Sequence, residues 1–374
     1  MTDKIFAMHR LFFVAKPITD GVIYLMKALL LAGGLGTRLR PLTEEMPKPM
    51  APVGNRPWIE HLVLQLKEQG IREFVIALKH YPEAIRRHFG DGSRFGVEVA
   101  YTLEEEALGT AGAIKHAERL LGDRFLVLNA DVVQRLDILP LLEFHRDHGG
   151  AVTIGLTEVE DPSQFGVVDL TGFGRIARFV EKPARGEAPS NLINAGIYVM
   201  EKRALRYIPE GREVSIERET FPELIRAGEG VYGCPVKGYW LDMGTRERYR
   251  QVHWDLLDRK LKLPINGTER GSGLWIGKDC SIGSGALLVP PVVVGDRVRI
   301  GDKAVVGPYS VIGDDCRIMN GARLSETILW DGCIVRQGAQ LHQCVFGFGS
   351  EIGSRHILYE AVVNRMRLGE AVPV

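Results

Sequence analysis

The chain has 374 residues, which is more than one hydrophobic core usually serves, so we expect two domains. Apolar residues make up 45% and charged residues 25%, ordinary values that exclude long disorder and a membrane protein. Lys plus Arg and Asp plus Glu number 47 each, so no net field exists to hold nucleic acid or an anionic membrane. Any binding of phosphates must therefore come from local clusters of charge.

The cysteines and the first 25 residues bear on where the protein resides. The five cysteines have neither the spacing of a metal knuckle nor the density of a secreted disulfide scaffold, so we expect reduced thiols in the cytoplasm. Leu11–Ala15 is too short and broken for a spanning helix, and no small-residue cleavage site follows a proper apolar region. We therefore predict that residues 1–25 are an extension outside the core, and that Met26 opens the first strand.

Residues 26–263 alternate short apolar runs with helical stretches, as in a parallel sheet flanked by helices. The predicted strands are Ala28–Leu31, Phe74–Leu78, Val97–Tyr101, Phe125–Asn129, Val152–Leu156 and Ile193–Met200. Pro57–Gln69 reads as an amphipathic helix with Pro near its start and Gly just past its end, and Leu136–His148 likewise ends before a Gly. This alternation predicts an α/β domain with a Rossmann-like, mostly parallel sheet.

Residues 264–374 follow a different pattern, a hexapeptide repeat. Aliphatic residues recur at a strict spacing of six, at Ile276, Ile282, Leu288, Val294, Ile300, Val306, Ile312, Ile318 and Leu324. Such a period fits a β-helix in which the aliphatic side chains stack inward and Gly helps the chain turn corners. From Ser325 the register loosens, so we expect irregular coils to close the stack and Ile357–Arg367 to cap it.

The most informative segment, Leu29–Pro52, reads LLLAGGLGTRLRPLTEEMPKPMAP. It leads from a buried strand into a glycine-rich loop, whose backbone can approach a phosphate closely and point N–H groups at it. Arg38 and Arg40 would neutralise the anion, and Lys48, between two prolines, adds a positioned cation. A P-loop is excluded because no Lys-Ser/Thr pair follows the last Gly, and a dinucleotide fingerprint because Leu39 replaces its third Gly. The loop suits a triphosphate; the alternative is a Gly-rich turn with solvated arginines.

This segment resembles the signature of the sugar nucleotidylyltransferase (NDP-sugar pyrophosphorylase) family. Further matching strings are LGTAGA (Leu108–Ala113), LNAD (Leu128–Asp131), FVEKP (Phe179–Pro183), INAGIYV (Ile193–Val199), VSIERETFP (Val214–Pro222) and YWLDMGT (Tyr239–Thr245). The resemblance covers the chain from Met26 onward and is greatest to the mannose-1-phosphate guanylyltransferase subgroup with a C-terminal left-handed β-helix.

The resemblance implies transfer of a nucleotidyl group from a nucleoside triphosphate to a sugar 1-phosphate, with pyrophosphate released. It favours GTP and mannose 1-phosphate, and leaves glucose 1-phosphate with UTP or dTTP as the main alternative. The nucleotide-binding residues that it implies are Ala32, Gly33, Gly34, Gly36, Thr37, Arg38, Gly109 and Thr110. Gly109 and Thr110 also have a structural explanation, a helix start with Thr110 as its cap.

Two aspartates are candidate metal ligands. Asp131 follows the apolar run Phe125–Leu128, which places a carboxylate at the carboxyl end of a sheet strand, where open α/β sheets bind ligands. Asp242 ends a second such run. Two carboxylates together with substrate phosphates and water are how Mg²⁺ is usually held, so we expect Mg²⁺ as the cofactor.

A second set of residues is expected to hold the sugar phosphate. Glu181 and Lys182 follow a predicted strand end, and the resemblance implies that Lys182 holds the phosphate and Glu181 a sugar hydroxyl. Asn194 and Gly166 match positions that line the sugar pocket, although an Asn in a strand and a Gly in a hairpin each have a structural explanation. The bare Glu-Lys pair would otherwise be a solvated ion pair.

The expected reaction is an in-line displacement at the α-phosphorus. Its nucleophile, a phosphate oxygen, is already anionic, so catalysis reduces to positioning and electrostatics. We expect Arg38 and Lys48 to stabilise the departing pyrophosphate, Lys182 to hold the attacking phosphate, and Asp131 and Asp242 to hold the metal. These five residues form the predicted catalytic set.

Two rival functions remain open from the sequence. Hexapeptide coils also build acyltransferases, which usually need a catalytic His; none occurs from Trp275 to Leu341, but His342 and His356 follow. A non-catalytic paralogue that senses NDP-sugars would be expected to lose a metal ligand or a phosphate-binding cation, and all five predicted catalytic residues are present. A homo-oligomer formed through the β-helix is also expected, because stacked coils often associate side to side.

Overall fold

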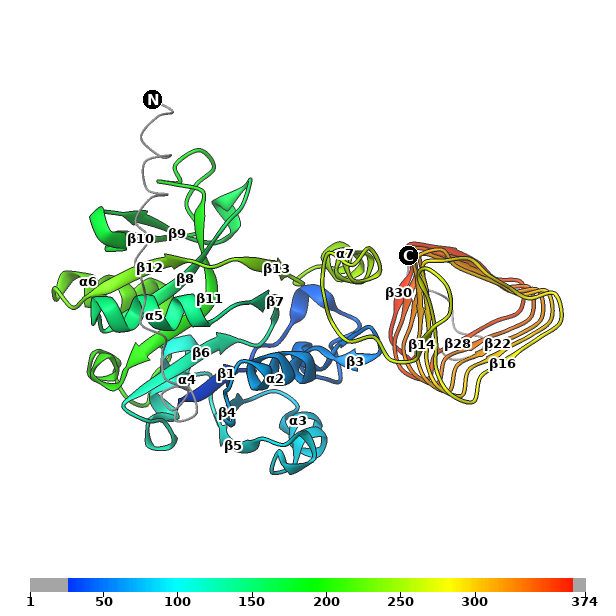
Figure 1. Cartoon of the computed structure of the whole chain (residues 1–374), viewed down its shortest axis with the longest axis horizontal. Coiled ribbons are helices and arrows are strands. Elements are labelled where there is room, and N and C mark those ends of the chain that lie inside the picture. Colours follow the sequence, from blue (N-terminus) through cyan, green and yellow to red (C-terminus); the bar gives the residue numbers. More distant parts are fainter. Residues whose placement is uncertain (1–25, 366–374) are drawn as a thin grey trace.

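The computed structural model describes residues 26–365 (Figure 1). The predicted extension at residues 1–25 and the end of the predicted cap, Met366 and Arg367, lie outside this range. Within it, a nine-stranded sheet covered by helices is followed by a β-helix, and helix α7 (Arg246–Leu257) lies between the two (Figure 1). The predicted α/β fold followed by a left-handed β-helix is confirmed. No helix in the described range is long and apolar enough to cross a membrane.

Four strands form the parallel half of the sheet, in the order β6, β1, β4, β5. They are β1 (Lys27–Leu31), β4 (Glu73–Leu78), β5 (Glu98–Leu103) and β6 (Arg124–Asn129). Alternate residues of β1 enter two cores, because Ala28 and Leu30 pack on the side of α2 (Trp58–Glu68) and Leu29 on the side of α4 (Gly109–His116). Burial on both faces explains why β1, β4 and β6 are continuous apolar runs in the sequence, whereas the edge strand β5 is more exposed.

The other half of the sheet is mixed. Strand β11 (Leu192–Glu201) pairs antiparallel with β6 and with β8 (Val152–Glu158), and β12 (Val231–Pro235) runs parallel to β8. Strands β9 (Gly166–Leu170) and β10 (Ile176–Glu181) form an antiparallel pair at the edge. This half therefore carries the residues predicted to bind the sugar phosphate.

One predicted helix is shorter than expected. The remaining helices are α3 (Pro82–Phe89), α5 (Leu139–His148) and α6 (Phe221–Arg226). The helix predicted over Leu136–His148 begins only at Leu139, because Val132–Leu136 forms strand β7. Strand β7 pairs antiparallel with β13 (Gly238–Asp242) in a separate two-stranded ribbon. The predicted start was wrong because pairing with a distant strand decides the structure of this segment.

Three sheets form the walls of the β-helix, and each coil adds one short parallel strand to each wall (Figure 1). The first wall holds β14 (Thr268–Glu269), β15 (Leu274–Ile276), β18 (Val292–Val294), β21 (Ser310–Ile312), β24 (Ile328–Leu329), β27 (Val345–Phe346) and β30 (Val362–Val363). The exception is the first strand of this wall, β14, which pairs antiparallel with β15. The second holds β16 (Ser281–Ile282), β19 (Arg299–Ile300), β22 (Arg317–Ile318), β25 (Ile334–Val335) and β28 (Glu351–Ile352). The third holds β17 (Leu287–Leu288), β20 (Val305–Val306), β23 (Arg323–Ser325), β26 (Gln340–His342) and β29 (Ile357–Tyr359).

The later coils are regular, although the hexapeptide pattern breaks after Ser325. Val293 pairs with Val311, eighteen positions further on, whereas Val311 pairs with Ile328, only seventeen further on. The shorter coils repeat through β30, so the segment predicted as a cap begins with two more strands of the stack. One residue fewer at the corner between the third and first walls shifts the sequence period without interrupting the ladder.

Asp331 stands at a corner of the β-helix, where its carboxylate accepts the Asp314 backbone N–H at 2.9 Å. Crowding of the carboxylate by surrounding atoms, together with the charges of Asp314 and Asp315, raises the pKa of Asp331 to about 6, although the residue is exposed to solvent. Between its ordinary pKa and this value the folded protein holds a proton that the unfolded chain releases, so stability falls as the pH rises from about 4 to about 6. Asn320 accepts the Asp302 N–H at 3.0 Å in a neighbouring corner without carrying a charge.

Because solvent screens an exposed carboxylate, changing Asp331 to asparagine is expected to raise the Tm by only about a degree at pH 7.5 and to change it little below pH 4. Thermal unfolding followed by circular dichroism at both pH values measures this. Asp315→Asn is the matched control, since hydrogen bonds from the Arg297 guanidinium lower the pKa of Asp315 and its loss should not stabilise the fold. A lower Tm for Asp331→Asn at pH 7.5 would contradict the expected sign.

One hydrophobic core runs across both domains. The first wall of the β-helix contributes Val293, Val311, Ile328, Val345 and Val362 to the same buried cluster as the helices of the sheet domain. That cluster includes Trp58 of α2, Tyr249 of α7 and Trp330 of the β-helix, all fully or almost fully buried. The β-helix is therefore packed against the sheet domain rather than tethered to it.

Candidate active site

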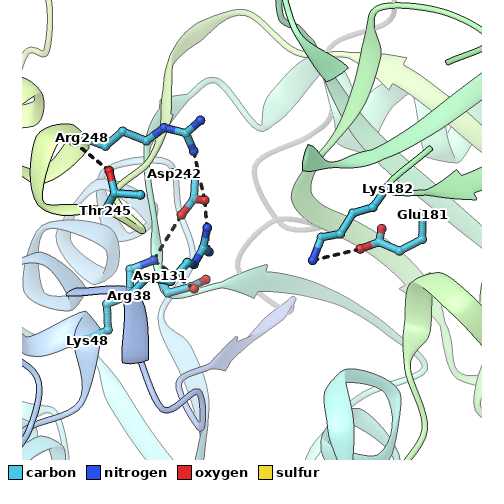
Figure 2. Close-up of polar contacts among 8 residues, drawn as sticks. All are labelled: Arg38, Lys48, Asp131, Glu181, Lys182, Asp242, Thr245 and Arg248. Atoms are coloured by element: carbon cyan, nitrogen blue, oxygen red, sulfur yellow. Dashed lines mark hydrogen bonds and ion pairs between the residues drawn. The ribbon is translucent and has the colours of Figure 1, made fainter. Parts of the chain in front are cut away.

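Lys48 lies between the two predicted metal-ligating carboxylates (Figure 2). Its Nζ is 3.1 Å from Oδ2 of Asp131 and 3.2 Å from Oδ1 of Asp242, and only 3% of the residue is exposed. Lys48 begins the short 3-10 turn Lys48–Met50, directly after Pro47. Three of the five residues predicted to be catalytic therefore meet at one point.

The β7–β13 ribbon explains why the two aspartates are neighbours. Asp131 directly precedes β7, and Val132, the first residue of β7, is the ladder partner of Asp242 at the end of β13. The ribbon thus brings together two carboxylates that are far apart in sequence. The apolar runs indicate each strand end separately, but the pairing itself has no local signal.

Two arginines with exposed side chains contact Asp242 (Figure 2). Arg38, in the 3-10 turn Thr37–Leu39, has Nη2 at 3.5 Å from Oδ2 of Asp242, and Arg248 has Nη1 at 3.4 Å from the same oxygen. Arg248 lies in the first turn of α7, whose N-cap Thr245 accepts the Arg248 backbone N–H. Arg248 was not predicted, although a Thr cap with an Arg three residues later, just after Asp242, was a usable signal.

The glycine-rich loop lines a pocket of about 360 Å³. Of the residues predicted to bind the nucleotide, Ala32, Gly33, Gly34, Gly36, Gly109 and Thr110 line it, together with Lys48 and Asp131. Gly36 has φ +60°, and a Cβ there would stand 2.9 Å from Cβ of Lys48, so glycine allows the loop and the lysine turn to approach each other. Thr37 and Arg38 begin the turn that leaves this loop.

The buried carboxylate of Glu104 also lines this pocket and was not predicted. Its Oε2 accepts the Leu108 backbone N–H at 3.1 Å, and its Oε1 lies 3.2 Å from the place of a Cβ on Gly33. Burial raises the pKa of Glu104, an effect that the hydrogen bond from Leu108 and then the charge of Lys79 partly offset. Its position just beyond β5 was the available signal, since strand ends at this edge of a sheet supply ligand contacts.

Helix α4 begins differently from the prediction. Thr110 was expected to cap the helix, but the cap position is Leu108 and no side chain caps it. The Thr110 hydroxyl instead donates to Glu217 at 2.9 Å and accepts the Ile216 backbone N–H at 2.8 Å. The cap prediction was wrong because a tertiary partner, the π-helical segment Ile216–Thr220, takes up the hydroxyl. Gly109 lines the pocket. It lies so close to Val214 that a Cβ on it would stand 2.6 Å from the Val214 carbonyl oxygen.

The residues predicted to bind the sugar phosphate form a second group, facing the first across the site (Figure 2). Lys182 Nζ lies 3.7 Å from Oε1 of Glu181, and Gly166 is the ladder partner of Glu181. Burial, followed by the nearby Glu217 charge, raises the pKa of Glu181. Asn194 donates to the buried Tyr198 hydroxyl at 2.8 Å, which fixes its orientation.

Glu217 is a further acidic side chain of this second group that was not predicted. Its Oε2 accepts hydrogen bonds from the hydroxyls of Thr110 and Ser215, both at 2.9 Å. Thr110 lies on the nucleotide side and Glu217 beside Glu181, so this contact joins the two halves of the site. Its place within the VSIERETFP string was the only signal in the sequence.

The carboxylates fit a hard divalent cation. The Asp131 and Asp242 oxygens already converge on one positive charge, the Lys48 ammonium, and oxygen donors are what such cations prefer. Within residues 26–365 no group of three or more His, Cys, Asp or Glu side chains could hold a metal ion. An ion at this site would therefore take its remaining ligands from substrate phosphates and water.

Comparison with known proteins identifies the family of the chain. The model of the family described as nucleotidyl transferase matches residues 27–259, and that of the GMPPB C-terminal domain matches residues 288–374. The chain belongs to the nucleotidyl transferase family. It is thus a nucleotidyltransferase, and enzymes of this family typically use a divalent metal ion.

Several relatives in the family match along most of the chain. A mannose-1-phosphate guanylyltransferase of Mycobacterium tuberculosis is 36% identical over 318 residues, which cover 84% of this chain and 83% of the relative. A UTP–glucose-1-phosphate uridylyltransferase of Synechocystis sp. is 35% identical over 339 residues, covering 86% and 87%. The crystal structure of HddC from Yersinia pseudotuberculosis complexed with GMP-PN has a TM-score of 0.53 and 28% identity, and covers 61% of this chain and 98% of that one.

Proposed function

We propose that the enzyme transfers the guanylyl group of GTP to mannose 1-phosphate, giving GDP-mannose and pyrophosphate. A phosphate oxygen of the sugar phosphate attacks the α-phosphorus, and the bond to the β-phosphate oxygen breaks as pyrophosphate leaves. The observation that carries the reaction class is the convergence of Lys48, Asp131 and Asp242 beside the glycine-lined pocket. The attacking oxygen is already anionic, so the site needs to align and neutralise two polyanions rather than remove a proton.

The charged residues divide this work between the two ends of the reaction. Arg38 and Lys48 stabilise charge on the departing pyrophosphate, and Lys182, on the opposite side, holds the attacking phosphate. Asp131 and Asp242 would hold Mg²⁺, which supplies Lewis-acid polarisation of the phosphate oxygens when bound. Glu181 and Asn194 would bind the hydroxyls of the sugar beside Gly166, and the hydrogen bond from Asn194 to the Tyr198 hydroxyl holds the Asn194 side chain in place.

The preference for GTP rests on the carboxylate of Glu104. Guanine alone among the common bases presents two adjacent donors, its ring N–H and its amino group, so both can donate to a single carboxylate. Uracil and thymine present one N–H between two carbonyl oxygens, which a carboxylate repels, and adenine and cytosine present a ring acceptor beside their amino group. A buried site built for two donors rejects a base that lacks them, since its own polar atoms are then left unpaired.

Pyrophosphate release by the purified protein with Mg²⁺ tests the proposal, using four common triphosphates against a panel of sugar 1-phosphates. Release with GTP and mannose 1-phosphate alone is the expected result. Release with UTP or dTTP and glucose 1-phosphate would keep the reaction and replace the substrates. No release with any pair would favour the sensing paralogue.

Two expectations from the sequence stay predictions, the cytoplasmic location and the homo-oligomer formed through the β-helix. The rival acyltransferase function also stays untested. For this rival function, His342 lies on β26, where its Nδ1 shares a hydrogen bond with the Ser325 hydroxyl at 2.8 Å. An acetyl-transfer assay with the same preparation would address that alternative directly.

A further inference from the structure

Helix α7 joins the active site to the β-helix through one fully buried residue, Tyr249. The Trp330 indole N–H of the β-helix donates to the Tyr249 hydroxyl at 2.9 Å, and that hydroxyl donates to the Pro52 carbonyl at 2.5 Å. Both rings are almost completely excluded from solvent. The hydroxyl therefore uses its one donor and one acceptor site to link the two domains.

Hydrogen bonds from both domains fix the segment that Tyr249 contacts. Pro52 begins the small hairpin of β2 (Pro52–Val53) and β3 (Arg56–Pro57). The His61 ring Nε2 donates to the Val53 carbonyl at 2.9 Å, and burial lowers the pKa of His61 to about 4, so the ring is neutral. At the tip of the hairpin, the Asn55 side chain donates to the Ile312 carbonyl of the β-helix at 2.7 Å.

This hairpin directly follows the Lys48 turn. The Ala51 backbone N–H donates to the Lys48 carbonyl at 3.0 Å, and the Ala51 carbonyl accepts the Trp58 N–H at 3.1 Å. On its other side, Lys48 is in close approach to Gly36 of the glycine-rich loop. A displacement of Pro52 would therefore be passed to the Lys48 ammonium through a short hydrogen-bonded turn.

We propose that the β-helix is a positioning part of the active site, in which Trp330 holds Tyr249 and Tyr249 holds the Lys48 turn. Trp330 and Tyr249 touch no substrate and are positioning residues. The inference rests on the role proposed above for Lys48 at the departing pyrophosphate. It assigns the β-helix a part in catalysis beyond packing.

The test uses Trp330→Phe in the full chain, which keeps an aromatic ring but removes the indole donor and part of the buried ring system, alongside Tyr249→Phe, which removes only the hydroxyl that both hydrogen bonds share. We expect kcat for pyrophosphate release to fall about tenfold, with the KM for the sugar phosphate unchanged. In a Lys48→Ala background the same change should have no further effect, because both act through one group. Tyr309→Phe is the control, since it removes another contact between the domains, from the Tyr309 hydroxyl to Asp258 at 2.8 Å, away from the turn.

Several outcomes would overturn the inference. Trp330→Phe with unchanged kcat, or with an equal loss of kcat in the Lys48→Ala background, would show that the contact does not act through Lys48. If Trp330→Phe does not fold, as judged by its thermal unfolding, Tyr249→Phe provides the same comparison. Full activity of Lys48→Ala alone would overturn the role of Lys48 and this inference together, whereas an inactive Lys48→Ala with a fully active Trp330→Phe would overturn only the inference.

Discussion

Changing either Asp131 or Asp242 to asparagine is expected to lower kcat/KM for pyrophosphate release on the order of 10³-fold, with little change in Tm. Each change keeps the shape of the side chain and removes one of the two charges that converge beside Lys48. Because the two carboxylates act on the same cation, the double variant should be about as slow as either single one. Steady-state rates as a function of Mg²⁺ concentration measure the effect, and higher metal should restore part of the loss in each single variant.

Asp137→Asn is the matched control for this pair. Asp137 lies just beyond the far end of β7 and accepts the Leu139 backbone N–H, a bond that an asparagine oxygen can also accept. Its variant should keep full activity. If Asp131→Asn and Asp242→Asn were as active as this control, the metal site proposed here would be in the wrong place.

The change Glu104→Gln is expected to lower kcat/KM for GTP roughly 30-fold, which corresponds to a loss of about 2 kcal/mol of transition-state stabilisation. The same change is expected to raise kcat/KM for UTP or dTTP. Glutamine still accepts the Leu108 N–H but presents one acceptor and one donor group, which matches the N–H and carbonyl of a pyrimidine instead of the two donors of guanine. Competition between GTP and UTP in one reaction, read as the ratio of the two NDP-sugars, measures the shift. The KM for the sugar phosphate should stay the same.

Glu105 and Glu106 provide controls on the same loop, because both are exposed and neither lines the pocket. Their change to glutamine alters the net charge as Glu104→Gln does, without placing an amide in the pocket. An equal loss of GTP activity in all three variants would mean that charge near the site, rather than recognition of the base, causes the effect. Unaltered base preference in Glu104→Gln would remove the support for GTP.

Local signals in the sequence were sufficient for much of the fold. Strands β1, β4 and β6 are buried on both faces, so their apolar runs identified them to within a residue. The hexapeptide period identified the β-helix because each inward position must be filled in every coil. The five predicted catalytic residues are all within the described range, and two of them, Asp131 and Asp242, contact a third, Lys48.

What the sequence did not indicate depends on contacts between distant segments. Strand β7 exists because β13, about a hundred residues later, pairs with it. Thr110 resembles a helix cap locally, yet its hydroxyl bonds to the Glu217 segment. The only signal for Glu104 was its position just after β5, and a carboxylate within an acidic stretch looks solvated until the pocket around it is seen.

The core shared by the two domains sets how the molecule should come apart. Valines of the first wall, together with Trp330 and Tyr249, form one buried cluster across the domain boundary. Each domain alone would therefore expose apolar side chains that the other domain covers. Calorimetry should therefore record a single cooperative transition, without a separate step for either half. A fragment ending near residue 263 would present that apolar face to water and aggregate unless the face were redesigned.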